Sequence, residues 1–237
     1  MRHHNHSSGK RAPLHNSIDM VLSFIKWPLA LALCIFFVPA FNTFVKFSSE
    51  YLNNYYIFHF LIPMGAFCIF FFIAANLQNS MLAIAEHELT HALFALLTFH
   101  KITGMEIEQD KGGHVQLIGR GNWLIVLAPY FFPTFAVIML LIGAVYSAFG
   151  EPWPAFLLPS YGAMIGYHIC AIITQIHPKQ TDFNEAGYLF TFLFLPGANL
   201  IFFGLLFAIA FKQWEGIPLY FKYLWYSTKV FLEQIMS

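Results

Sequence analysis

Long apolar segments separated by short polar ones run through most of this chain. A helix needs about 20 predominantly apolar residues to cross the hydrocarbon core of a bilayer. Six segments meet this requirement, namely residues 20–47, 57–77, 80–99, 123–149, 155–176 and 188–211. The pattern therefore predicts an all-α membrane protein with about six transmembrane helices.

Two regions depart from this pattern. Residues 100–122 place charged residues and glycines between Ile, Met, Val and Leu. This is typical of a short β-hairpin inserted after the third apolar segment, with Lys111-Gly112-Gly113 as the turn. The end of the chain mixes lysines with Trp and Tyr, as interfacial amphipathic helices do. We predict three parts: a polar N-terminal tail (1–19), a membrane domain (20–211) and an amphipathic C-terminal helix (212–237).

Composition supports the membrane interpretation. Of the 237 residues, 58% are hydrophobic and 10% are charged, whereas about 25% are charged in an average soluble domain. A soluble domain of this size has no place to bury so much apolar surface. The formal net charge is zero, which gives no indication of a nucleic-acid partner. We expect a multi-pass protein of a bacterial cell membrane, surrounded by the lipid bilayer.

One apolar segment contains the sequence His87-Glu88-Leu89-Thr90-His91. Ionisable groups at membrane depth are costly, so they are functional candidates. Residues four apart share a helix face, so His87 and His91 can bind one metal ion. Zinc lowers the pKa of its bound water to about 7, and Glu88 is placed to take the proton of that water as it attacks a carbonyl. The alternative interpretation is a buried polar cluster that packs helices together.

A catalytic zinc usually has three protein ligands and one position for water. The chain has three aspartates, of which Asp19 lies in a terminal segment and Asp110 in the predicted hairpin. Asp182 lies between two apolar segments, where Pro178 and Gly187 interrupt the helices. Irregular backbone is tolerated at membrane depth where it lines a cavity. Asp182 is therefore the predicted third ligand, provided that residues 177–187 fold back to the depth of the histidines. Helix capping is its alternative role, and the competing ligands are His177, Glu185 and His168.

These features together resemble the site-2 protease family of intramembrane zinc metalloproteases, over roughly residues 57–211. The resemblance rests on His87-Glu88-Leu89-Thr90-His91-Ala92, the glycine-containing hairpin, and an aspartate two segments later. In the family a glycine usually follows this aspartate, whereas here Phe183 follows Asp182. The chain therefore resembles a divergent member, represented by the membrane core only. The resemblance implies Zn²⁺ as the cofactor and a membrane-spanning protein segment as the substrate.

The sequence thus predicts an intramembrane zinc endopeptidase that cleaves transmembrane or membrane-proximal segments by zinc-activated water. A membrane-spanning substrate helix must unwind before water reaches its amides, and Asn199 is a candidate for competing with its hydrogen bonds. His168 is a candidate for bonding a ligand carboxylate or an oxyanion. For both residues an ordinary interhelical hydrogen bond is the alternative. The alternative functions are a metal-ion transporter and a non-proteolytic zinc-binding membrane scaffold.

Overall fold

The computed structural model describes residues 14–51, 55–74, 80–108, 112–176 and 180–237. The helices are α1 (Leu14–Tyr51), α2 (Tyr56–Ile73), α3 (Met81–Leu97), α4 (Trp123–Leu127), α5 (Thr134–Ala148), α6 (Leu157–Gln175), α7 (Thr181–Ala186), α8 (Tyr188–Lys212) and α9 (Gly216–Met236). Two 3₁₀ turns, η2 (Ala128–Tyr130) and η3 (Gln213–Glu215), follow α4 and α8. The strands β1 (Ile102–Glu108) and β2 (Gly112–Leu117) pair antiparallel.

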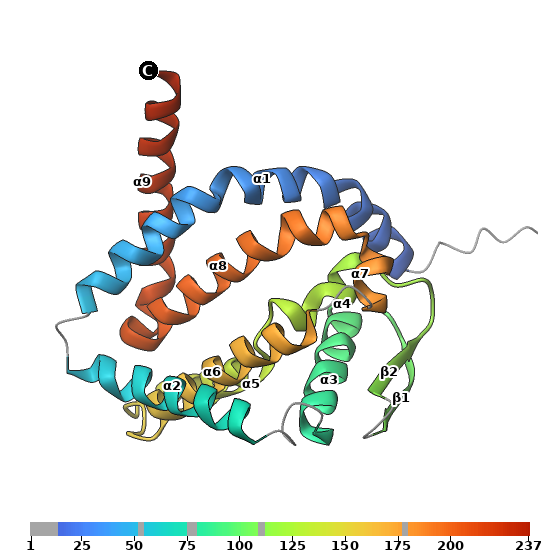
Figure 1. Cartoon of the computed structure of the whole chain (residues 1–237), viewed down its shortest axis with the longest axis horizontal. Coiled ribbons are helices and arrows are strands. Elements are labelled where there is room, and N and C mark those ends of the chain that lie inside the picture. Colours follow the sequence, from blue (N-terminus) through green and yellow to red (C-terminus); the bar gives the residue numbers. More distant parts are fainter. Residues whose placement is uncertain (1–13, 52–54, 75–79, 109–111, 177–179) are drawn as a thin grey trace, which may run out of the picture.

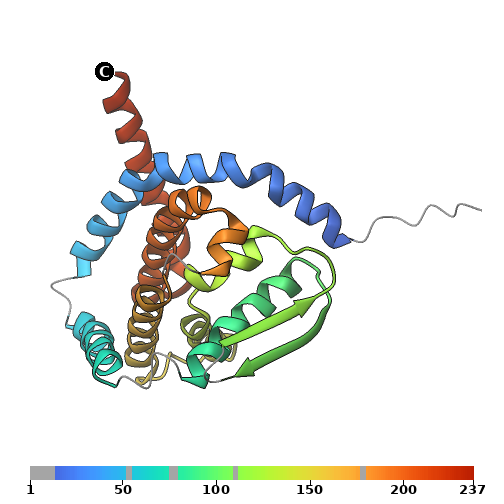
Figure 2. The same cartoon turned by 45° about the vertical axis from the view of Figure 1, so that its right-hand side comes forward.

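The helices form two layers that meet beside a small sheet. Helix α1 lies along α8, and α2 lies along α6 on the other side of the molecule (Figure 1). Helix α9 packs against both α1 and α8, and its C-terminal part extends away from the body. The hairpin runs beside α3 (Figure 2). An apolar core that includes Trp123, Phe183 and Phe190 joins α4, α7 and α8 at this end.

The crossing of α2 and α6 depends on two glycines. A Cβ atom at Gly162 would lie 2.2 Å from the carbonyl oxygen of Phe60, and one at Gly166 would lie 2.5 Å from that of Met64. The two glycines are four residues apart, so they form one strip on α6 along which the α2 backbone approaches closely. A larger residue at either position would push the helices apart.

The all-α membrane class is confirmed, but the number of spans differs from the expected six. In the described part of the chain, four helical segments are long and apolar enough to cross a membrane: α1, α2, α6, and α8 together with α9. Segment 123–149 was expected to be one span, but α4 with η2 meets α5 at 85°, so this pair adds at most a fifth span. Helix α3 has 17 residues and is about 25 Å long, shorter than the hydrocarbon core of about 30 Å.

The structure also revises the predicted turn of the hairpin. The hairpin is confirmed, but Gly112 and Gly113 belong to β2 rather than to the turn, and Lys111 lies outside the described residues. Helix α1 begins at Leu14, within the predicted polar tail. In this part of α1, the carboxylate of Asp19 accepts a hydrogen bond from the side chain of Asn122.

Candidate metal centre

The two histidines of the motif lie one turn apart on α3, with their rings facing the interior. Helix α3 is capped by Ser80, whose hydroxyl accepts a hydrogen bond from the amide of Ala83. The Nε2 atoms of His87 and His91 lie 3.1 Å apart. Helical spacing alone produces this arrangement, since residues i and i+4 share a face.

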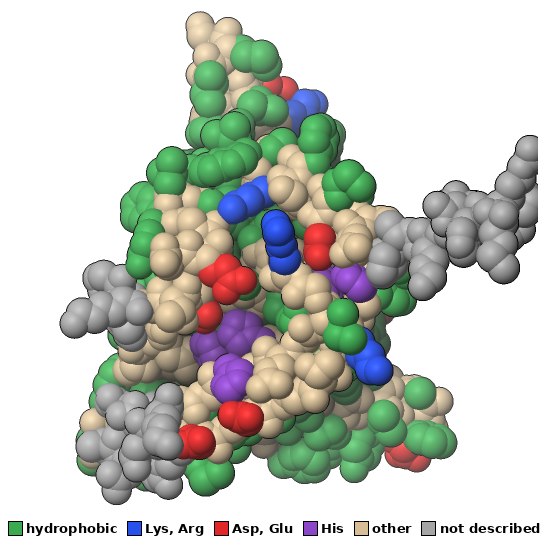
Figure 3. Space-filling model, turned by 90° about the vertical axis from the view of Figure 1, so that its right-hand side faces the viewer, with side chains coloured by type: hydrophobic (Ala, Val, Ile, Leu, Met, Phe, Trp, Pro, Cys, Tyr) green, Lys and Arg blue, Asp and Glu red, His purple; other side chains and the backbone are tan. Residues whose placement is uncertain are grey.

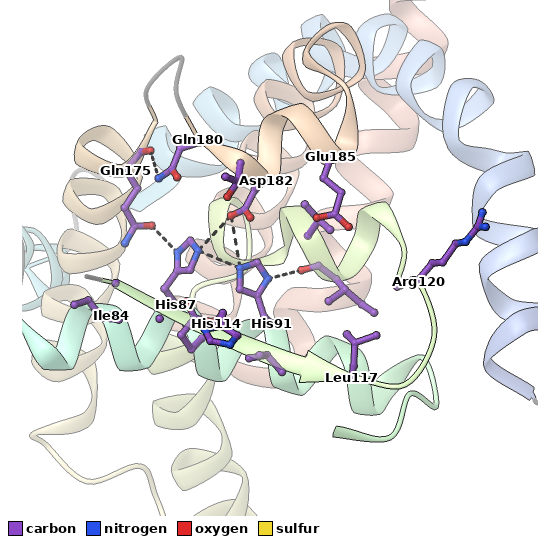
Figure 4. Close-up of a pocket in the computed structure, with 18 of the residues that line it drawn as sticks. Ile84, His87, His91, His114, Leu117, Arg120, Gln175, Gln180, Asp182 and Glu185 are labelled. Atoms are coloured by element: carbon purple, nitrogen blue, oxygen red, sulfur yellow. Dashed lines mark hydrogen bonds and ion pairs between the residues drawn. The ribbon is translucent and has the colours of Figure 1, made fainter. Parts of the chain in front are cut away.

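Asp182 reaches the histidines from a separate helix. Its Oδ2 atom lies 3.4 Å from Nε2 of His87 and 3.6 Å from Nε2 of His91 (Figure 4). Asp182 lies in the first turn of the six-residue helix α7, which ends at Ala186 and packs against α4 and α8; the next residue, Gly187, has a φ of +88°. The described part of the segment 177–187 therefore folds back toward α3, as the three-ligand prediction requires.

The outer ring nitrogens of both histidines have oxygen partners. Nδ1 of His91 donates to the carbonyl oxygen of Ile125 at 2.8 Å, because a carbonyl can only accept. Nδ1 of His87 lies 3.0 Å from Oε1 of Gln175, the acceptor atom of that amide. With the proton on Nδ1, each neutral ring directs an Nε2 lone pair toward the other ring and toward Asp182, which is the orientation typical of metal-binding histidines.

The three inner atoms fit a tetrahedral zinc ion. Zinc–nitrogen and zinc–oxygen distances of about 2.0–2.2 Å place two ligands of a tetrahedral site about 3.3 Å apart. The observed separations are 3.1, 3.4 and 3.6 Å. Two facing lone pairs and a carboxylate repel one another unless a cation lies between them. Among the described residues, His87, His91 and Asp182 form the one group of three side chains able to hold a metal ion.

Glu88 lies next to His87 on α3, beside these ligands. Its side chain is buried, and its Oε2 atom has no hydrogen-bond partner among the described residues. Strand β2 passes directly over it: a Cβ atom at Gly113 would lie 2.5 Å from Cγ of Glu88. A buried carboxylate oxygen without a donor is costly, so this atom is available for a group that enters the site.

The site opens into a cavity of about 680 Å³. Its walls come from α3, β2, the loop that follows β2, and helices α4, α6 and α7. On one face of the molecule, histidine and acidic side chains gather in a hollow (Figure 3). Glu185 also lines the cavity. Burial raises the pKa of Glu185, and the nearby charge of Asp182 raises it further.

Sequence reasoning did not identify Tyr130, which is fully buried in η2. Its hydroxyl donates to Oδ2 of Asp182 at 2.8 Å, and its ring packs against Phe183 with centroids 4.7 Å apart. Asn199 acts on the same turn, because its amide donates to the backbone carbonyl of Tyr130 at 2.9 Å. The available signal was indirect: Tyr130 lies between Pro129 and Pro133. Prolines interrupt an apolar helix, and the backbone groups that the interruption leaves free need side-chain partners.

The competing ligand candidates are not part of the three-residue group. His168 is buried in α6, lies outside the cavity lining, and has no hydrogen-bond partner on either ring nitrogen among the described residues. Asn199 likewise lies outside the cavity lining. Glu185 lines the cavity but is not one of the three grouped residues. His177 lies outside the described residues.

Fold and site together describe a helical membrane protein in which two histidines and an aspartate could hold a metal ion. A family model described as Peptidase M50B-like matches residues 66–172, which include α3, the hairpin, α4, α5 and most of α6. This match over somewhat less than half of the chain supports membership of the site-2 protease family. No curated protein and no solved structure gives a significant match.

Proposed function

We propose that this chain is an intramembrane zinc endopeptidase that cleaves transmembrane or membrane-proximal segments of other proteins. The observation that carries the proposal is the position of Glu88. Its Oε2 atom is buried and, among the described residues, unpaired, and Glu88 lines the same cavity as His87, His91 and Asp182. A structural zinc site has no need of a free carboxylate beside its ligands, whereas a hydrolytic site needs a base there.

In the proposed reaction, each residue of the site has a separate role. His87, His91 and Asp182 would hold the zinc ion, which when bound acts as a Lewis acid that activates water and polarises a carbonyl. Glu88 takes the proton of the attacking water and returns it to the amide nitrogen as the carbon–nitrogen bond breaks. Gln175 and the carbonyl of Ile125 keep the two imidazoles in one tautomer and orientation.

The size of the cavity favours an unwound substrate. A helix with its side chains is about 10–12 Å across and hides its amides in internal hydrogen bonds. The cavity of about 680 Å³ is of the size that holds a small ligand. A short extended stretch of peptide therefore fits at Glu88, and a membrane-spanning substrate has to unwind locally to enter.

The proposal is tested by combining metal analysis with cleavage in proteoliposomes. A single-span reporter protein is reconstituted with the wild type, Glu88→Gln, His91→Ala, Asp182→Asn, or the exposed control Glu215→Gln. We expect one zinc per chain and cleavage for the wild type and the control. Glu88→Gln should keep zinc without cleaving, while the two ligand variants should lose both.

Other outcomes would contradict the proposal. Cleavage by Glu88→Gln at the wild-type rate would exclude Glu88 as the base. Zinc flux across the vesicle membrane without cleavage would favour a transporter. Bound zinc in all variants, with neither flux nor cleavage, would favour a scaffold.

A further inference from the structure

Helix α1 precedes the part of the chain that matches the family, yet it contacts α4, whose Ile125 carbonyl binds His91, and α7, which carries Asp182. We infer that Asp19 and Lys26 of α1 are positioning residues for His91 and Asp182, an inference that rests on the proposed metal centre. The two residues are seven apart, so they lie on one face of α1. The carbonyl of Leu22, on the same face, accepts a hydrogen bond of 2.8 Å from Nε1 of Trp123 in α4.

Asp19 acts on α4. Its Oδ1 atom accepts a hydrogen bond of 2.7 Å from Nδ2 of Asn122, and its Oδ2 atom lies 3.1 Å from Nε2 of the buried His100. With both carboxylate oxygens engaged, Asp19 is held in place. It in turn fixes which way the amide of Asn122 points, because only Nδ2 can donate to a carboxylate.

The orientation of Asn122 sets the position of α4. Its Oδ1 atom accepts from the amides of Leu124 and Ile125, each at 3.1 Å, and so caps the helix. Helix α4 has five residues, too few to be stable without such contacts. The carbonyl of Ile125 then accepts the Nδ1 proton of His91. A continuous series of hydrogen bonds thus links α1 to the ring of one candidate ligand.

Lys26 acts on α7. Its Nζ atom donates a hydrogen bond of 2.7 Å to the carbonyl of Ala186, the last residue of that helix, and lies 4.8 Å from the ring centre of Phe190. Asp182 is one turn earlier on the same helix. A half-buried lysine within an apolar helix is costly, and a cation at a helix C-terminus stabilises that end.

A cavity between α1 and the site explains why polar side chains carry these contacts. It has a volume of about 200 Å³, and Asp19, Lys26, Asn122 and Glu185 are among the residues that line it. Apolar packing does not fill this space. If either polar contact is lost, no other contact between α1 and the described residues in this space replaces it, and α4 or α7 can shift. The 3.6 Å separation of His91 and Asp182 is then no longer maintained.

The test uses Asp19→Asn and Lys26→Met in the full chain, with Lys26→Arg as the conservative replacement. Matched controls are Glu50→Gln and Lys46→Met near the other end of α1, where both side chains contact Tyr223 of α9. Zinc affinity is measured by competition with a chelator, and the visible spectrum is recorded after substitution with cobalt. We expect each test variant to weaken zinc binding by about 10-fold or more and to alter the cobalt spectrum. Lys26→Arg should restore both, and the controls should match the wild type.

Wild-type affinity and spectrum in both test variants would overturn the inference, as would an equal loss in the controls. If one test variant does not fold, the other decides, because the two act on different helices. These outcomes are separate from those for the proposed function. A wild type that binds zinc but cleaves nothing, with weakened zinc binding in the test variants, supports the positioning role and contradicts the protease. If the wild type cleaves the reporter but both test variants bind zinc normally, the result supports the protease and contradicts the positioning role.

Discussion

Removal of the Tyr130 hydroxyl should weaken zinc binding without disturbing the fold. In Tyr130→Phe the ring remains in its buried position against Phe183, and only the 2.8 Å hydrogen bond to Asp182 is lost. A hydrogen bond to a charged group contributes about 1.5–3 kcal/mol. Because about 1.4 kcal/mol corresponds to a factor of ten, zinc affinity should fall by about 10- to 100-fold, the range seen for partners of metal ligands.

The assay is chelator competition on purified protein, with thermal unfolding measured in parallel. Tyr220→Phe is the matched control, because Tyr220 is as fully buried as Tyr130 but its hydroxyl has no hydrogen-bond partner among the described residues. We expect zinc affinity to fall in Tyr130→Phe alone. If both variants bind zinc like the wild type, Tyr130 does not orient Asp182 as a ligand.

Three further predictions concern the glycines and the metal. Gly113→Ala should retain zinc but lose about 100-fold in cleavage rate, because its Cβ atom would lie 2.5 Å from Cγ of Glu88; an unchanged rate would show that β2 can shift freely. Gly162→Ala should lower the free energy of unfolding by about 1–3 kcal/mol through its contact with Phe60, whereas Gly65→Ala, with nothing within 4 Å of the added Cβ, should not. Removal of zinc by a chelator should lower the melting temperature, and zinc at about 100 times its Kd should restore about 2.7 kcal/mol; a melting temperature insensitive to zinc would contradict binding at this centre.

The hydrophobic pattern predicted the helical membrane class because apolar length is a property of each segment alone. It did not predict the break in segment 123–149. That break depends on Phe131 packing into the core beside Phe94 and Phe194, while Pro133 precedes the first turn of α5. It also did not predict the shortness of α3. The chain leaves the helix at Phe99, which has a φ of +60°, a feature that apolarity does not encode.

Some residues of the candidate site could likewise be predicted from the sequence, and others could not. His87, Glu88 and His91 could be predicted because helical spacing alone brings them together. The prediction of Asp182 as a ligand depended on two observations: a carboxylate can bind a metal ion, and this one lies in an interrupted segment between two apolar ones. Tyr130 had no comparable signal, because its role is to donate one hydrogen bond across 52 positions of sequence.

The partners that act through backbone carbonyls are the hardest to predict from sequence. Ile125 binds the ring of His91 through its carbonyl oxygen, and Lys26 reaches α7 through that of Ala186. Neither the type of side chain at position 125 nor that at position 186 indicates these roles. They follow only from the way α1, α4 and α7 pack together.

The most direct test of zinc-dependent intramembrane proteolysis compares wild type and Glu88→Gln at equal zinc content. Both are reconstituted with a single-span substrate, and the products are identified by mass spectrometry. The wild type should cut within or next to the apolar segment of the substrate, and Glu88→Gln should produce no fragment. The same fragments at the same rate from both proteins would contradict the account.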